Sequence, residues 1–367
     1  MPQTVPGIPQ LLVSLHPDAV ISSRYTLKGL IDEGGCGQVW LAMDAVTNKQ
    51  VAIKFPRVDQ GSDQRERFAS ELQILKHLPH HPHLVQLLDE GVFEGQQFLV
   101  MEYFPKTLSA WLHEHRAMRQ LPALFTVYRL FAQICDAVAA AHRLPVPIIH
   151  RDINPRNIML SEDARGELSA KVLDFGIGRI GKRQHTQTGE CIGTPGYMSP
   201  EQMNGDAADV GTGSDVYSLG ILAFEMLCLE HPSTADTAPR SDVPRLLWDV
   251  IATATHPRIS QRYNDAQALR TAWGNCIAFA YEQSVAQGVP TLRETTHLRP
   301  NVEVSSSNGV VAFQQEEQET QPTAVQNTKI TARPLAEEPV TVRSSSNPRL
   351  PWDIQKMRHW WNRLRRA

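Results

Sequence analysis

The sequence predicts an α+β chain with two lobes, a small β-rich lobe followed by a larger helical one. Short β-type runs, such as VWLAMD and QVAIKF on either side of a TNK turn signal, dominate residues 24–103. Helical patterns, such as TVYRLFAQICDAVAAAHRL, dominate residues 104–278. Strands followed by helices favour two segregated regions that pack against each other.

The segments follow one another in a clear order. Residues 1–23 are rich in proline and lack a period, which predicts a flexible arm. One helical segment interrupts the strands, with apolar residues recurring at Phe68, Leu72, Leu75 and Leu78. The apolar run at 216–229 is too short to span a membrane and carries Glu225, so it predicts a buried core helix.

The last part of the chain differs from the lobes. Residues 279–351 are rich in Gln, Glu, Thr, Ser and Pro, a composition that predicts a disordered linker. Residues 352–367 predict a basic amphipathic helix, with tryptophans on one arc and Lys and Arg on the rest. Such a helix fits an anionic membrane surface, and docking to a partner protein is an equal alternative.

Composition excludes several classes of protein. The net charge of −3 argues against a whole-molecule nucleic-acid binder, so no specific nucleic-acid partner is expected. The five cysteines form no CxxC pair, which argues against a disulfide framework and fits a reducing compartment. The N-terminus lacks the features of a signal peptide. We therefore expect a cytoplasmic protein, peripheral at the inner face of the membrane if residues 352–367 bind lipid.

Several short motifs carry groups suited to phosphate chemistry. IDEGGCGQVW at 31–40 is a Gly-rich turn between two strand-like runs, and such a turn lets backbone N–H groups approach phosphates. A plain flexible hairpin is an equal reading of this turn alone. VAIK follows with Lys54, which could neutralise phosphate charge, and Glu71 on the next helical segment could pair with it.

The remaining motifs come later, in order. HRDINPRN at 150–157 supplies Asp152, a possible base for a hydroxyl, and Asn157, a possible metal ligand. A strand-like AKVL leads to Asp174-Phe175-Gly176, which offers a second magnesium ligand. The sequence then reaches Ser199-Pro200-Glu201. Each motif is common by chance, but the whole ordered series at these spacings is not.

Over about residues 25–275 the sequence resembles the protein kinase family, and within it the bacterial Ser/Thr kinases of the eukaryotic-like type. HTQTGECIGTPGYMSPEQ at 185–202 contributes much of this resemblance, and Thr194 is typical of Ser/Thr enzymes. The resemblance implies a protein-kinase-like fold with ATP and Mg²⁺, or Mn²⁺, bound between the lobes. It implies an enzyme that transfers the γ-phosphoryl group of ATP to hydroxyls of protein substrates, whose identity the sequence does not give.

The resemblance also implies residue roles. Catalysis would rest on Lys54, Glu71, Asp152, Asn157 and Asp174, the last two as metal ligands. Nucleotide contacts would come from Ile31, Gly34, Gly35, Gly37, Val39, Lys54, Glu102 and Phe104, with Met101 beside the hinge. Asp215 would brace the catalytic loop, and Glu201 would pair with Arg262. Arg151 would receive a phosphate on Thr186 or Thr188 in the activation segment.

Two positions depart from the family pattern. Asp32 replaces the first glycine of the nucleotide loop and should weaken ATP binding if its side chain points inward. Asn154 stands where Ser/Thr kinases carry a lysine that touches the γ-phosphate. Arg156 could supply the missing cation from two positions later. With the other groups present, we favour an active enzyme over two alternatives, a nucleotide-binding pseudokinase scaffold and a small-molecule phosphotransferase.

Overall fold

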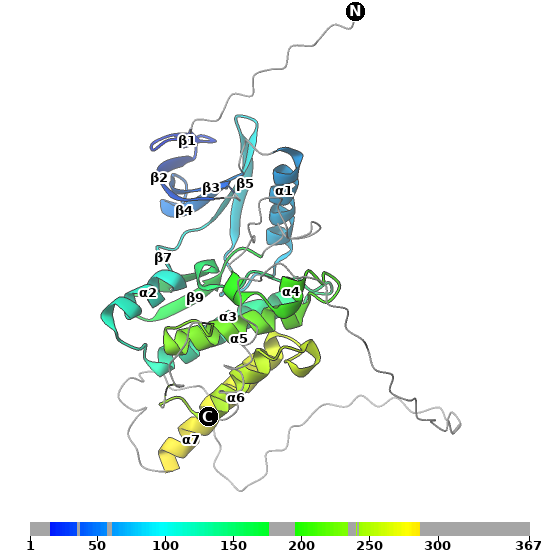
Figure 1. Ribbon diagram of the computed structural model, residues 1–367. Helices are drawn as coiled ribbons and strands as arrows, with labels where there is room; N and C mark the ends of the chain where they lie inside the picture. The colour runs from blue at the N-terminus through cyan, green and yellow to red at the C-terminus, as the bar shows by residue number, and fades with distance from the viewer. Residues whose placement is uncertain are drawn as a thin grey trace, which may run out of the picture.

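The fold was analysed in a computed structural model, which describes residues 15–34, 37–56, 61–175, 195–233, 240 and 242–286. Predictions for residues beyond these ranges, including Gly35, Thr186, Thr188 and the tail at 352–367, lie outside the described structure. Figure 1 shows the strands of the first lobe together with α1, and below them the helices of the second lobe. The predicted division into a β-rich lobe followed by a helical lobe is confirmed.

The first lobe is built on an antiparallel six-stranded sheet in the order β1-β2-β3-β4-β6-β5. Alternating residues such as Leu27, Trp40 and Ile53 fill one buried face, as the period of two along a strand requires. The strands are β1 Val20–Ile21, β2 Tyr25–Gly34, β3 Gly37–Asp44, β4 Lys49–Phe55, β5 Leu87–Phe93 and β6 Gln96–Glu102.

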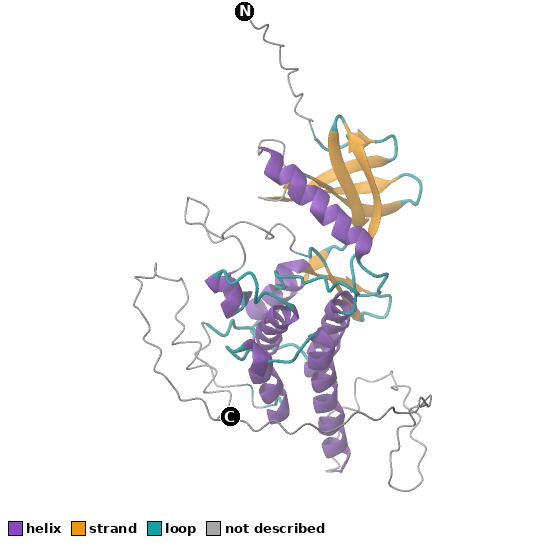
Figure 2. Cartoon of the chain, turned by 90° about the vertical axis from the view of Figure 1, so that its right-hand side faces the viewer, coloured by secondary structure: helices purple, strands orange, loops and turns teal. Residues whose placement is uncertain are grey.

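Helix α1, Gly61–His77, covers part of this sheet, and Figure 2 shows it running alongside the strands. Phe68, Leu72 and Leu75 recur at helical spacing and pack against Leu99 and Met101 of β6. The predicted helical segment is therefore confirmed. Its packing decides which strand face Glu71, on the same helix, can approach.

The predicted arm is wrong for residues 15–23. Val20–Ile21 forms β1 and pairs with β2, Ile21 is fully buried, and Leu15 and Ala19 pack against the same core. A two-residue strand is too short to show a period in the sequence. Its stability comes from pairing with the edge of β2, which is a tertiary effect.

The second lobe is helical, with a small three-stranded sheet on the side facing the first lobe. Helix α5 is buried along most of its length, which confirms the core helix predicted at 216–229. Helix α3 is long and apolar enough to cross a membrane, but 67% of it is buried inside the protein. The helices are α2 Leu108–Met118, α3 Leu124–His142, α4 Pro200–Asn204, α5 Thr212–Cys228, α6 Arg245–Ala254 and α7 Ala266–Ala286, and the strands are β7 Lys106–Thr107, β8 Ile158–Glu162 and β9 Leu168–Val172.

Helix α7 runs to Ala286, past the domain boundary predicted at residue 278. The linker predicted over 279–351 therefore starts too early. Trp273 anchors this helix, because its fully buried ring lies against Tyr128 and Phe131 of α3. Once the helix is docked, each further residue adds a hydrogen bond at little cost, which composition alone does not reveal.

Candidate functional site

The loop between α3 and β8 carries Asp152, and Asp215 in the first turn of α5 holds it in place. The Asp215 carboxylate accepts hydrogen bonds from the backbone N–H groups of His150 and Arg151, both at 2.8 Å. It also contacts His142 Nε2 at 2.9 Å. Arg151 has a positive φ of 65°, a conformation that such anchoring can maintain. The bracing role predicted for Asp215 is confirmed.

Two asparagines from the same loop contact the Asp152 carboxylate. Asn157 Nδ2 donates to the Asp152 carbonyl at 2.8 Å and lies 3.3 Å from Oδ2. Asn154 Nδ2 donates to the same carbonyl at 3.0 Å and lies 3.2 Å from Oδ1. Asn154 is therefore part of the loop framework. Arg156, two residues after Asn154 in the same loop, is exposed.

Lys54 of β4, Glu71 of α1 and Asp174, two residues after β9, come together. Lys54 Nζ lies 2.5 Å from Glu71 Oε1 and 3.8 Å from Asp174 Oδ1. Burial raises the pKa of the Glu71 carboxyl above its ordinary value; Lys54 opposes this rise and Asp174 adds to it. The three groups thus form a charge cluster in which the buried Lys54 faces two partly exposed carboxylates.

The glycine-rich turn joins β2 to β3 next to this cluster. Gly37 has a φ of +124°, and a Cβ there would lie 2.0 Å from the Phe55 carbonyl oxygen, so only glycine fits. Asp32 pairs with Val39 across the strands, and Val39 pairs with Lys54 on the next strand. Directly opposed residues share a sheet face, so exposed Asp32 lies on the Lys54 face.

The segment after β6 connects the two lobes. Met101 is buried, and the Glu102 carboxylate is held by Lys171 Nζ at 2.7 and 2.9 Å and by the Gln86 N–H at 3.0 Å. Lys171 Nζ also lies 5.5 Å from the centre of the Phe104 ring. The Glu102 side chain is therefore engaged within the protein, and the nucleotide contacts predicted for Glu102 and Phe104 stay a prediction.

The residues predicted to hold a divalent metal fit such an ion. Asp174 Oδ1 is buried and has no hydrogen-bond partner among the described residues. The hydrogen bonds from the Asn157 side chain to Asp152 both use its amide nitrogen, which leaves its oxygen for a ligand. A carboxylate and an amide oxygen suit Mg²⁺, which typically completes its shell with waters and substrate phosphates.

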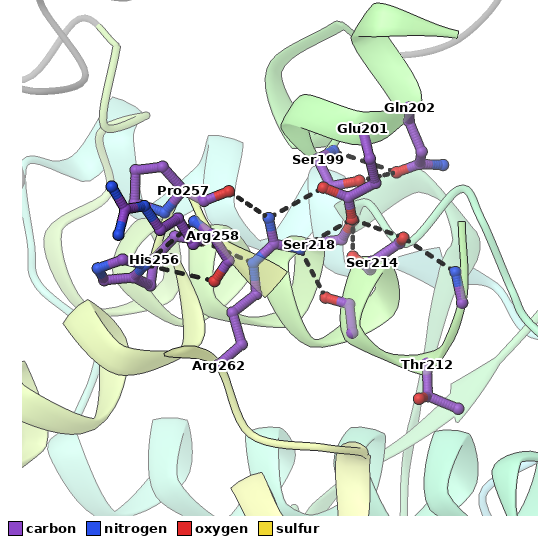
Figure 3. Close-up of polar contacts among 12 residues, drawn as sticks. Ser199, Glu201, Gln202, Thr212, Ser214, Ser218, His256, Pro257, Arg258 and Arg262 are labelled. Atoms are coloured by element: carbon purple, nitrogen blue, oxygen red, sulfur yellow. Dashed lines mark hydrogen bonds and ion pairs between the residues drawn. The ribbon is translucent and has the colours of Figure 1, made fainter. Parts of the chain in front are cut away.

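Glu201, in the first turn of α4, forms a buried ion pair with Arg262. Figure 3 shows Glu201 facing Arg262, with nitrogen–oxygen distances of 2.8 and 2.9 Å. Arg262 also donates to the carbonyls of His256, Gly213 and Pro257. The Ser214 hydroxyl donates to Glu201 at 2.7 Å. The pairing predicted for Glu201 and Arg262 is confirmed.

A second polar cluster anchors the residues just before α4. The Tyr197 hydroxyl donates to Glu225, which also pairs with Arg116. The His231 ring packs edge-on against Tyr197, and its Nε2 lies 3.0 Å from the Gly196 carbonyl oxygen, to which it donates. These contacts fix the chain at 195–199 to α5 and α2.

Sequence reasoning missed several supporting residues. His142, Ser214 and Lys171 each contact a predicted residue, yet each lies more than ten positions from its partner along the chain. No local spacing signals such contacts. Gly35 and the regulatory residues Thr186 and Thr188 lie outside the described residues, so the structure does not place them.

Comparisons with known proteins agree with this geometry. Residues 25–272 match the family described as protein kinase domain. The chain is 31% identical over 280 residues to probable serine/threonine-protein kinase PknB of Lactococcus lactis, covering 69% of this chain and 42% of that protein. It is 36% identical to PrkC of Bacillus subtilis, covering 59% and 32% respectively. It is 32% identical to PknL of Mycobacterium bovis, covering 68% and 65%.

The solved structures give the same fold. A crystal structure of the Mycobacterium tuberculosis PknI kinase domain, a double mutant, superposes with a TM-score of 0.54 at 20% identity, covering 72% of this chain and 100% of that one. The fold and the matched sequence together define a two-lobed protein kinase fold. The chain belongs to the protein kinase family, and its curated relatives are bacterial Ser/Thr protein kinases. It spans between 32% and 65% of the length of those relatives.

Proposed function

We propose that the chain is an active Ser/Thr protein kinase that transfers the γ-phosphoryl group of ATP to protein hydroxyls. The observation that carries the proposal is the charge cluster: Lys54 contacts Glu71 while lying 3.8 Å from Asp174. Phosphoryl transfer needs positioning and charge neutralisation, and this cluster provides both next to the Asp152 loop.

Each group has a distinct task in the proposed reaction. Lys54, oriented by Glu71, binds phosphate oxygens of ATP. The oxygen of the substrate hydroxyl bonds to the γ-phosphorus, and Asp152 accepts the proton of that hydroxyl. The bond between the γ-phosphorus and the β–γ bridging oxygen breaks, and ADP leaves. Asn157 and Asp174 would hold the divalent cation, which supplies positive charge to the phosphates when bound.

Arg156 is the proposed source of the remaining positive charge near the γ-phosphate. It is exposed, in the 3₁₀ turn Pro155–Asn157 of the catalytic loop. Burial raises the pKa of Tyr197, and the charges of Arg116 and Arg156 counteract this rise. A guanidinium is permanently charged and presents several donors to phosphate oxygens.

Protein substrates are favoured over small molecules because of the segment at 195–204. The contacts of Tyr197 and Glu201 fix this segment in the helical lobe, as a platform for an extended peptide would require. The pseudokinase alternative predicts the same fold without turnover. The small-molecule alternative predicts phosphorylation of an added alcohol but not of protein.

Regulation and location are further parts of the proposal. A phosphate on Thr186 or Thr188 would bind Arg151 through charge-assisted hydrogen bonds. Residues 352–367 would hold a cytoplasmic enzyme at the inner face of the membrane. Deleting them should reduce binding to anionic vesicles, and equal binding with and without them would favour a partner protein instead.

One experiment tests the proposal directly. The purified protein is incubated with ATP and Mg²⁺, with and without a generic protein substrate, and phosphosites are mapped by mass spectrometry. Asp152→Asn serves as the inactive control. We expect phosphate on substrate Ser or Thr and on Thr186 or Thr188. No difference between wild type and Asp152→Asn would favour the pseudokinase, and phosphate only outside 177–199 would exclude activation-segment autophosphorylation.

A further inference from the structure

Asn154 occupies an unusual place for a residue that lacks the expected charge. Its side chain is buried, with the residue 2% exposed, and it lies between Asp152 and the turn that carries Arg156 and Asn157. A mere replacement for a phosphate-binding lysine would be expected to face the ligand. Both polar atoms of the Asn154 side chain instead form hydrogen bonds with groups of the loop itself.

The orientation of the Asn154 amide follows from its partners. Its Oδ1 accepts a hydrogen bond from the Arg156 backbone N–H at 2.9 Å. A backbone N–H can only donate, so the oxygen must face it. The Nδ2 group therefore faces Asp152, at 3.0 Å from the carbonyl and 3.2 Å from Oδ1.

Asn157 provides a matching contact on the other side of the same carboxylate. Its Nδ2 lies 3.3 Å from Asp152 Oδ2, so each carboxylate oxygen has an amide donor from the loop. Pro155 stands between the two asparagines at the first position of a 3₁₀ turn, Pro155–Asn157, for which Asn154 is the N-cap. Proline fixes its own φ there, which makes the spacing of the two donors rigid.

A lysine in this position could not make the same set of contacts. Its ammonium group has three donors and no acceptor, so the Arg156 N–H would lose its cap. Asparagine provides both an acceptor and a donor on one short side chain. In this loop a short side chain that is bonded at both ends therefore stands where a flexible lysine would otherwise be.

We infer that Asn154 is a positioning residue that bridges the Asp152 carboxylate to the Arg156 backbone and so fixes the carboxylate for the substrate hydroxyl. This inference rests on the proposed phosphoryl transfer. In this inference Asn154 acts by orienting the Asp152 carboxylate and makes no direct contact with ATP.

Two substitutions separate the two ends of the bridge. Asn154→Ser keeps a capping oxygen but is too short to reach the Asp152 carboxylate. We expect single-turnover transfer to slow by about 10- to 100-fold, with unchanged ATP affinity and a melting temperature within about 2 °C of wild type. Asn154→Lys keeps a donor and loses the cap, so it should melt about 2–4 °C lower and transfer faster than the serine variant.

The outcomes decide the inference in either direction. A serine variant as fast as wild type would overturn it, as would one in which transfer, ATP affinity and melting temperature all fall together. If wild-type protein transfers no phosphoryl group, the proposed function fails separately. Crystal structures of wild type and Asn154→Ser then decide the inference alone, because a rotated Asp152 carboxylate supports it and an unmoved one overturns it.

Discussion

Two ion pairs, Glu201–Arg262 and Lys54–Glu71, differ in the carboxylate oxygens around them. Arg262 is fully buried in its side chain and makes hydrogen bonds to both Glu201 oxygens and to three carbonyls. Lys54 contacts Glu71 through one oxygen, and a second carboxylate, Asp174, lies beside it with a buried oxygen that lacks a hydrogen-bond partner among the described residues.

The pKa directions express the same difference. Burial acts to raise the pKa of Glu201, but the hydrogen bonds from Arg262 and Ser214 outweigh it and the pKa is lowered. For Glu71, burial outweighs Lys54 and the pKa is raised. The saturated Glu201–Arg262 pair holds the fold together. The cluster around Lys54 is unsaturated at Asp174 Oδ1 and so retains the capacity to bind a charged ligand.

The largest effect should come from breaking the saturated pair. Arg262→Ala leaves the Glu201 charge buried without its partner, so the free energy of unfolding should fall by about 3–5 kcal/mol. Urea denaturation measures this loss. Arg258→Ala, an exposed arginine in the same segment, is the control and should change little. Equal stability of the two variants would contradict a structural role for Arg262.

The unsaturated cluster should respond in the opposite way. Asp174→Asn removes a carboxylate beside Glu71, so the melting temperature should stay level or rise, while phosphoryl transfer falls by about 10²–10³-fold. Single-turnover assays and thermal melts measure the two effects. Asp209→Asn, at an exposed site, controls for the loss of one negative charge. If Asp174→Asn melted at a lower temperature than wild type but transferred the phosphoryl group at the wild-type rate, the comparison would be contradicted.

Arg156 tests whether the charge missing at position 154 has moved. Arg156→Ala should slow transfer by about 10- to 100-fold with little change in ATP affinity, because the contact strengthens as charge develops on the transferring group. Arg165→Ala, an exposed loop arginine between β8 and β9, is the matched control. Wild-type rates in both variants would make Arg156 an ordinary surface residue.

Low pH should weaken the saturated pair. Because the folded-state pKa of Glu201 is lowered, the unfolded chain takes up a proton on this carboxyl first, and its contribution to stability is lost as pH falls below about 4.3. Glu201→Gln should therefore make the acid limb of stability less steep in urea titrations. Glu114→Gln, in an exposed ion pair with Lys106, should leave the slope unchanged. Identical slopes for wild type and Glu201→Gln would contradict the assignment.

The smallest effect should lie at the rim of the nucleotide site. Asp32→Gly removes a carboxylate from the Lys54 face and should tighten ATP binding by about two- to fivefold, since exposed charges interact weakly. Isothermal titration measures the affinity. Glu33, the next residue, contacts Gln38, and Glu33→Gly controls for added flexibility of the turn. Weaker binding by Asp32→Gly alone would mean that Asp32 supports the turn.

Much of the site was predictable because its motifs are local. Lys54 on a strand, Asp152 and Asn157 in one loop and Asp174 after a strand are short-range patterns whose backbone geometry follows from neighbouring residues. The helical lobe and α1 were predictable for the same reason, since apolar spacing reports the buried face. The two-residue β1 and the end of α7 were not, because pairing and docking set their limits.

The sequence by itself determined the chemical groups of the site: one lysine, three acids and one amide, which are Lys54, Glu71, Asp152, Asp174 and Asn157. Only the tertiary structure decided how they are used. It placed Asn154 as a bridge, turned the Glu102 carboxylate toward Lys171, and left Asp174 Oδ1 without a hydrogen-bond partner among the described residues. For Glu102 and Asp174, the physical reason is that hydrogen-bond saturation depends on partners from distant segments, which meet only when the chain folds. For Asn154, whose partners lie two residues away, it is the backbone conformation of the folded loop.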